Sequence, residues 1–254
     1  MPPDSVMPMA WTEGRAARVV FAVLGILLVT PVAIPAGQQT SANEYRTKLA
    51  SLEAVLRADP GSLEKGSAYR QLAMQSRQYD RAINFLKKLA EDQDVGDAYV
   101  TLGFAYVDKI PVSGPLRQLS LGKEAIGAFG KAIGVKPSWL AYYMRGLVNL
   151  YYARMFNRVR PAIADLEQAL KMQKTETKRG YHARAYRSLG DAYWKLGNLE
   201  RARTVWQEGL VEFPEDSAID ARLARHGRDL QVLIDSSLDP DARVDTSLQE
   251  LFAN

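Results

Sequence analysis

The sequence contains no cysteine and only two histidines, His182 and His226, among its 254 residues. The lack of cysteine excludes disulfides, thiol nucleophiles, thiolate metal sites and lipid-modified cysteine. Neither histidine has a second ligand at the spacing that a zinc or iron site needs, so both are expected to be exposed. A Gly-x-Ser-x-Gly turn and a glycine-rich phosphate loop are also missing. The sequence therefore predicts no catalytic residues, no metal site and no cofactor, and favours a protein that is not an enzyme.

Neither sign of charge is in large excess, since 33 lysines and arginines face 29 aspartates and glutamates, for a net charge of +4. This balance is too weak to predict nucleic-acid binding. The charges are unevenly distributed, however. The range 171–187 holds six basic residues and one acid, whereas the range 235–254 holds five acids and one base. These two stretches are therefore candidates for an attraction between distant parts of the chain.

Only one long apolar run occurs, at residues 19–36, and Arg15 and Arg18 precede it. A basic start, an apolar middle and small residues at the end are the three parts of a secretory signal. Residues 1–36 are therefore predicted to be a signal peptide or, if uncleaved, an N-terminal membrane anchor. Either places the rest of the chain in a bacterial periplasm or on the outer face of the inner membrane. The alternatives are a cytoplasmic protein that buries this segment as a helix, and an anchored regulator of reversed topology.

A repeat of 34 residues organises the rest of the chain, and its clearest copy covers residues 183–216. Gly190 has no side chain, so a second helix can approach the first closely there, and Trp206 fills the gap between them. Pro214 ends the unit because proline cannot continue a helix. The spacing resembles the tetratricopeptide repeat at every signature place, although Gly209 stands where the family usually has alanine. The matching residues are Tyr186, Leu189, Gly190, Tyr193, Ala202, Trp206, Gly209 and Pro214.

Two weaker copies precede this one. The first has the glycine-tyrosine pair Gly103 and Tyr106, but a segment with two prolines and a glycine, residues 109–120, interrupts it. We expect this segment to be a protruding loop. The second copy begins at Trp139, and four extra residues before Ala162 predict a first helix that is one turn longer than usual.

Outside these copies the pattern decays. Upstream there is one degenerate unit, and residues 215–236 are predicted to form a single closing helix, as the ends of repeat arrays require. The resemblance implies an all-α fold, an α-solenoid of three to four units over residues 62–236. A linker and leading helix (37–61) would precede the array, and an acidic, flexible tail (237–254) would follow it.

The family resemblance also implies where a partner binds. The first helices of tetratricopeptide repeats line a concave groove that takes extended peptides or helices. The places that face this groove predict a surface that is aromatic in the middle and cationic at its C-terminal end, which suits a peptide with apolar anchors and an acidic end. The alternatives are that its leucines pack inside the protein and that its arginines are only solvated. The predicted groove residues are Phe104, Tyr143, Leu147, Tyr151, Arg184, Arg187, Asp191, Trp194 and Lys195.

The sequence thus predicts a non-catalytic scaffold or assembly factor of the bacterial cell envelope, which binds a protein or peptide and no nucleic acid. It would touch the membrane only through an uncleaved N-terminal segment. One alternative is a subunit of an envelope transport or secretion complex that acts through the 109–120 loop, and a second is a membrane-anchored regulator. The opposite charges of the tail and of residues 171–187 further suggest that the tail folds back and occupies the groove until a partner displaces it.

Overall fold

The computed structural model describes residues 36–239, 246–247 and 249–252, so the predicted signal or anchor at 1–36 lies outside the described residues except for Ala36. Within them, every regular element is a helix. Three short 3₁₀-helices, Ile110–Val112, Arg154–Phe156 and Gly180–His182, accompany the following α-helices: α1 (Ala36–Ala58), α2 (Leu63–Gln75), α3 (Tyr79–Gln93), α4 (Gly96–Lys109), α5 (Pro115–Val135), α6 (Trp139–Tyr151), α7 (Val159–Gln173), α8 (Ala183–Leu196), α9 (Leu199–Glu212), α10 (Ser217–Ala224), α11 (Gly227–Ser237) and α12 (Gln249–Phe252).

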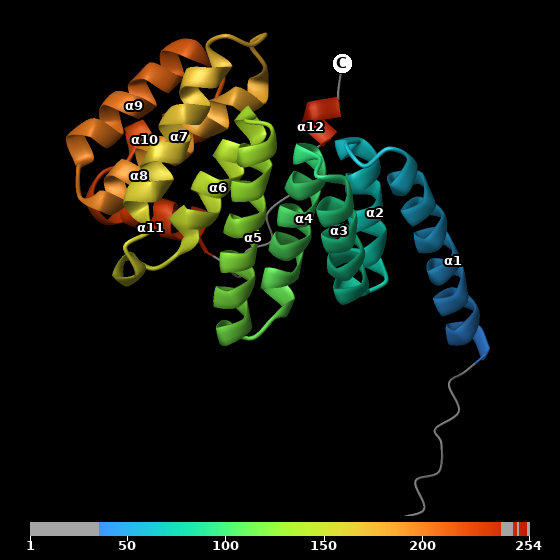
Figure 1. Ribbon diagram of the computed structural model, residues 1–254. Helices are drawn as coiled ribbons and strands as arrows, with labels where there is room; N and C mark the ends of the chain where they lie inside the picture. The colour runs from blue at the N-terminus through green and yellow to red at the C-terminus, as the bar shows by residue number, and fades with distance from the viewer. Residues whose placement is uncertain (1–35, 240–245, 248, 253–254) are drawn as a thin grey trace, which may run out of the picture.

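The helices pair in sequence order and stack side by side, as Figure 1 shows. The pairs are α2 with α3, α4 with α5, α6 with α7 and α8 with α9. Each pair also packs on the next, so the array is an α-solenoid of four two-helix units with one continuous core. The predicted fold class is confirmed. The leading helix α1 packs on α2 at one end of the array through Leu49 and Leu56, which are both buried.

Close approach at glycine holds the two helices of a unit together. A Cβ on Gly190 of α8 would lie 2.1 Å from Nε1 of Trp206 on α9, and one on Gly103 of α4 would lie 2.5 Å from the Phe129 ring on α5. Trp206 and Phe129 are both fully buried. The aromatic ring of the second helix therefore fills the space that glycine leaves on the first, as the repeat spacing predicts.

Two connections differ from the sequence prediction. Residues 109–120 do not form a loop, because Pro115 is the first residue of α5 and a 3₁₀ turn joins it to α4. Proline suits a helix start, where its missing N–H has no partner to lose. The insertion therefore lengthens α5 to 21 residues. In the next unit the extra residues do not lengthen α6, which ends at Tyr151, but form the irregular connection 152–158.

The closing segment also needs correction. Instead of one helix, it forms α10 and α11, which Arg225 and His226 separate. Gly227, the first residue of α11, lies in the left-handed region at φ +49°. His226 is exposed, as predicted. The prediction that His182 is exposed is wrong, because this side chain is 1% exposed and packs on the rings of Trp139 and Tyr181.

No helix in the described ranges is both long enough and apolar enough to cross a membrane.

Candidate partner-binding groove

The nine residues predicted to line the groove lie on the first helices of three successive units. We call the shared inner face of α2, α4, α6 and α8 the groove. Phe104 comes from α4; Tyr143, Leu147 and Tyr151 come from α6; and Arg184, Arg187, Asp191, Trp194 and Lys195 come from α8.

The centre of the groove is aromatic. The rings of Trp139 and Tyr143, one helical turn apart on α6, stack with centroids 4.9 Å apart. With Phe104, Leu147 and Arg184 they line a small cavity of about 60 Å³. Burial raises the pKa of Tyr143, although its hydrogen bond with Ser188 and the charge of Arg184 oppose this shift. The Tyr143 hydroxyl is therefore neutral at physiological pH, and the centre of the groove suits an apolar anchor.

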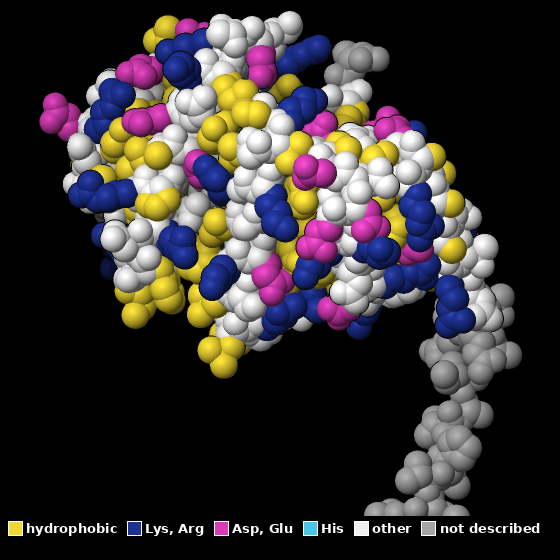
Figure 2. All heavy atoms as spheres, in the orientation of Figure 1, with side chains coloured by type: hydrophobic (Ala, Val, Ile, Leu, Met, Phe, Trp, Pro, Cys, Tyr) yellow, Lys and Arg dark blue, Asp and Glu magenta, His cyan; other side chains and the backbone are white. Residues whose placement is uncertain are grey.

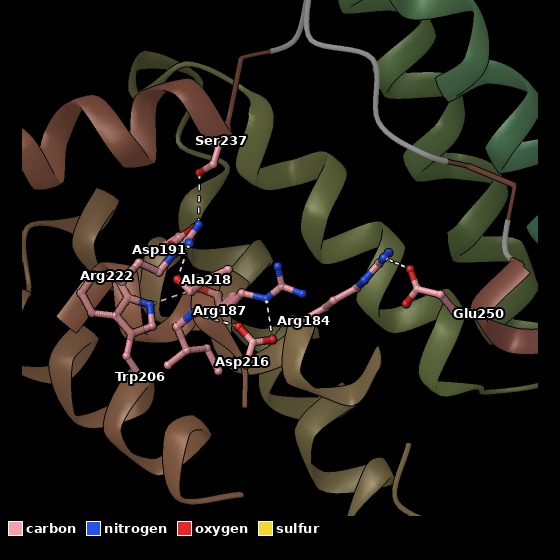
Figure 3. Close-up of polar contacts among 10 residues, drawn as sticks. Arg184, Arg187, Asp191, Trp206, Asp216, Ala218, Arg222, Ser237 and Glu250 are labelled. Atoms are coloured by element: carbon pink, nitrogen blue, oxygen red, sulfur yellow. Dashed lines mark hydrogen bonds and ion pairs between the residues drawn. The ribbon is translucent and has the colours of Figure 1, made fainter. Parts of the chain in front are cut away.

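The chain's own C-terminal segment enters this centre. Gln249, Glu250 and Leu251 of α12 line the same cavity. Glu250 forms an ion pair with Arg184 of α8, which Figure 3 shows reaching across to α12. The described part of the tail therefore contacts the array, and its glutamate meets the arginine that the sequence proposed for an acidic partner.

The N-terminal end of the groove holds the main chain of the tail. Arg70 of α2 donates to the carbonyl oxygen of Thr246 over 2.6 Å, and Ser67 donates to that of Ser247. Arg70 also forms a 2.6 Å ion pair with Asp108 of α4, and both side chains are almost fully buried. The Thr246 hydroxyl donates to the second carboxylate oxygen of Asp108. Two helices of the array and two residues of the tail thus form one buried polar network.

Sequence reasoning misses Ser67 and Arg70. Arg70 stands at the place where the repeat pattern expects glycine. That departure was the available signal, because an arginine in a position usually too crowded for a side chain must point to a specific partner. Its guanidinium lies 4.9 Å from the centre of the Phe104 ring, so it also covers the aromatic part of the groove.

The C-terminal end of the groove is closed by α10 and α11. Arg222 of α10 makes two hydrogen bonds of 2.7 Å to Asp191, in a pair that is almost fully buried (Figure 3). It also donates to the Ser237 hydroxyl at the end of α11. The Tyr151 hydroxyl donates to the Ser237 carbonyl over 3.4 Å, and burial raises the pKa of Tyr151 to about 12. Asp191 and Tyr151 therefore face the closing helices.

Three further predicted residues have partners within the protein. Arg187 lies 3.6 Å from Asp216, the N-cap residue of α10, and a dashed line marks this ion pair in Figure 3. Lys195 donates to the carbonyl oxygens of Leu150 and Tyr152 at the end of α6, and burial lowers its pKa. The guanidinium of Arg154 lies over the Trp194 ring, 5.3 Å from the ring centroid. Of the nine predicted residues, the structure thus brings Phe104, Tyr143, Leu147 and Arg184 together around the occupied cavity.

The outer surface has mixed charge. Lysine and arginine side chains alternate with acidic ones over the face in Figure 2, and apolar side chains protrude along its lower edge. Among the described residues, no group of three histidines, aspartates or glutamates is placed to hold a metal ion.

Comparison with known proteins agrees with this architecture. The family model described as tetratricopeptide repeat matches residues 152–217. No curated protein matches the sequence. Among solved structures, a thermophilic TPR protein of Thermus thermophilus is 21% identical, with a TM-score of 0.51, and the match covers 74% of this chain and 93% of that one.

Two further solved structures are similar at lower scores. A MamA protein is 23% identical with a TM-score of 0.48, covering 75% of this chain and 93% of that one. PilW, a type IV pilus biogenesis factor, is 16% identical with a TM-score of 0.48, covering 85% and 94%. The fold conclusion rests on the first structure and the family match. Proteins with this fold generally mediate protein–protein interaction. Residues 152–217 thus match the tetratricopeptide-repeat family, and the array as a whole has the fold of tetratricopeptide-repeat proteins.

Proposed function

We propose that this protein is a non-catalytic scaffold or assembly factor of a bacterial cell envelope, which holds a partner protein by a segment bound in the groove. The observation that carries this proposal is the occupied groove itself. Thr246 and Ser247, which lie outside any helix, and the short helix α12 contact α2, α4, α6 and α8 through both main-chain and side-chain groups. A surface that accepts one peptide segment in this way is chemically suited to accept another.

The envelope location is part of the proposal and rests on the sequence alone. Arg15, Arg18 and the apolar run that follows predict an exported body, which is either released into the periplasm or held at the inner membrane. Reporter fusions at the C-terminus test this point. We expect activity from a reporter that works only outside the cytoplasm. Activity from a cytoplasmic reporter would instead favour the membrane-anchored regulator.

Site-specific photocrosslinking in the full-length chain tests the groove. A photoreactive residue replaces Leu147, which is half-buried in the groove, or Val211, which is 81% exposed on the outer helix α9. We expect a defined protein adduct at position 147 that is absent at position 211 and is lost when Arg184→Glu is added. Adducts of equal yield at both positions, or one insensitive to Arg184→Glu, would contradict binding in the groove.

A second candidate surface supports the alternative of a transport or secretion subunit. We call it the apolar edge. It joins the start of α5 to the connection before α7, since the Tyr152 hydroxyl donates to the Leu119 carbonyl over 2.8 Å. Leu116 and Met155 are each 85% exposed. Exposed apolar residues clustered in this way mark interaction sites. The apolar edge comprises Val112, Leu116, Leu119, Met155 and Phe156.

The same photocrosslinking experiment separates the two surfaces. A photoreactive residue in place of Leu116 reports on the apolar edge while the groove stays intact. If the partner adduct forms at position 116 and not at position 147, the apolar edge is the docking surface and the groove proposal is wrong.

A further inference from the structure

The contacts of the tail divide into two kinds. Ser67 and Arg70 donate to carbonyl oxygens of the tail main chain, at residues 247 and 246. Every peptide has such carbonyls, so these two contacts select an extended backbone without selecting a sequence. They fix the position and direction of whatever segment lies across α2.

The second kind selects side chains. The buried Asp108 carboxylate has one oxygen on Arg70 and the other on the Thr246 hydroxyl. A short hydroxyl side chain donates from that position, and an apolar residue there would leave a buried acceptor unpaired. Arg184 favours an acid, which Glu250 supplies. Leu251 lines the aromatic cavity beside Trp139 and is the large apolar side chain that the tail brings there.

The groove fixes the spacing of these groups. Asp108 on α4 and Arg184 on α8 are two units apart, and the tail meets them with residues 246 and 250. The residue directly after the acid, Leu251, then lines the aromatic cavity. The pattern is a hydroxyl residue, an acid four positions later, and a large apolar residue immediately after the acid.

We propose that the partner segment carries this same pattern, and that residues 246–251 are a resident copy which the partner displaces. The proposal rests on the proposed function of the groove and adds the chemistry of its ligand: an acidic, hydroxyl-bearing peptide with one apolar anchor. Displacement is feasible because the buried Arg70–Asp108 pair belongs entirely to the array and stays paired when the tail leaves. Glu250 and Arg184 are both partly exposed, so their ion pair is weak.

Peptide binding to the full-length chain tests the proposal. The probe is a fluorescent peptide of residues 243–254, measured by anisotropy. The host is either the wild-type chain or the double variant Thr246→Val, Leu251→Asp, whose own tail no longer fits. A tethered segment competes at an effective concentration in the millimolar range, so we expect the double variant to bind the probe at least about ten-fold more tightly. Both tail residues lie outside the repeat units, and circular dichroism should show unchanged helix content.

A charge exchange then tests the pattern. In the double variant, Arg184→Glu should weaken binding of the native probe about ten-fold, and a probe carrying Glu250→Arg should restore it. Lys171→Glu, an equal charge change at an exposed position on α7, serves as the control and should leave both affinities unchanged. Equal binding by the wild-type chain and the double variant would show that the tail does not compete, and failure of the exchanged probe would overturn the role of Arg184. A groove partner that crosslinks at position 147 but lacks the pattern would overturn this inference alone and leave the proposed function standing.

Discussion

The two ends of the groove use the same buried arginine–aspartate chemistry in different ways. At the C-terminal end, Asp191 belongs to the array and its partner Arg222 belongs to the covering helix α10. At the N-terminal end, Arg70 and Asp108 both belong to the array, and the tail adds only the Thr246 hydroxyl and a carbonyl oxygen. The covering segment completes the ion pair at one end and only supplements it at the other.

This difference separates a structural cap from a replaceable occupant. Loss of the Arg222 side chain would leave the Asp191 carboxylate buried and unpaired beneath α10, which is costly. Loss of the tail would leave Arg70 and Asp108 still bound to each other, with water free to replace the tail's hydrogen bonds. The C-terminal end is therefore expected to open only when the protein unfolds, and the N-terminal end to open in the native state.

The largest expected effect is at the cap. Arg222→Ala removes the partner of a buried carboxylate and should lower the free energy of unfolding by roughly 3–5 kcal/mol. Urea denaturation followed by circular dichroism measures this change. Arg225→Ala, at an exposed neighbouring position, is the matched control and should change the free energy by less than about 0.5 kcal/mol. Similar small losses for both variants would remove the distinction between the two ends.

Truncation after Leu238 removes the occupant and should cost much less. The tail's hydrogen bonds each contribute roughly 1 kcal/mol net, partly offset by the entropy of ordering the segment, so we expect a loss of about 1–2 kcal/mol. The same denaturation experiment measures it. A loss as large as that of Arg222→Ala would mean that the tail is a second cap.

A third test concerns the pH dependence of stability. His182 contacts Trp139, which lines the aromatic cavity. Burial lowers the pKa of His182, and the charge of Arg179 lowers it further. Glu176 lies 3.6 Å from Nε2 and favours protonation, but its side chain is 42% exposed, so burial dominates. The unfolded state then binds the proton first, and stability falls as pH drops below about 6.5, by at most about 1.4 kcal/mol per pH unit.

Denaturation between pH 7.5 and 5.5 checks this sign. His182→Gln keeps a hydrogen-bond acceptor but does not titrate, so it should flatten the pH dependence in that window. A slope that persists in His182→Gln would show that another group titrates in this range.

The smallest expected effect is at the ion pair between Glu250 of the tail and Arg184 of α8. Glu250→Ala breaks a partly exposed ion pair and should change the free energy of unfolding by less than about 0.5 kcal/mol. Chemical denaturation measures this change. Arg222→Ala, measured in the same way, gives the largest expected loss for comparison. A loss above 1.5 kcal/mol would mean that the pair contributes to folding rather than to recognition.

The sequence predicted the repeat units well because their determinants are local. Gly190 and Trp206 lie on adjacent helices, and their spacing alone predicts that one fills the space beside the other. The helix at Pro115 was predicted wrongly because proline at a helix start and proline in a loop look alike without the packing partner. The tail's opposite charge suggested an intramolecular contact, but a charge pattern cannot supply the register that joins Thr246 to Asp108.

The groove was predicted only in part, because the repeat pattern is local. Repeat places identify which side chains point inward, so Phe104, Tyr143, Leu147 and Arg184 were found. They do not show which inward positions the closing helices cover, and so Asp191 and Tyr151 were predicted to face a partner although they meet α10 and α11. Arg70 departs from the family pattern, and only the fold shows that its partner is Asp108.

Hydrogen exchange of the native, full-length chain tests the central claim most directly, because it measures the opening of both ends in one experiment. We predict that the amides of α12 exchange at least about a hundred-fold faster than those of Leu230 and Ile234 in α11, and that adding the peptide of residues 243–254 speeds exchange in α12 only. Equal protection of α11 and α12, unaffected by the peptide, would contradict the account, because the tail would then be as fixed a part of the fold as the cap.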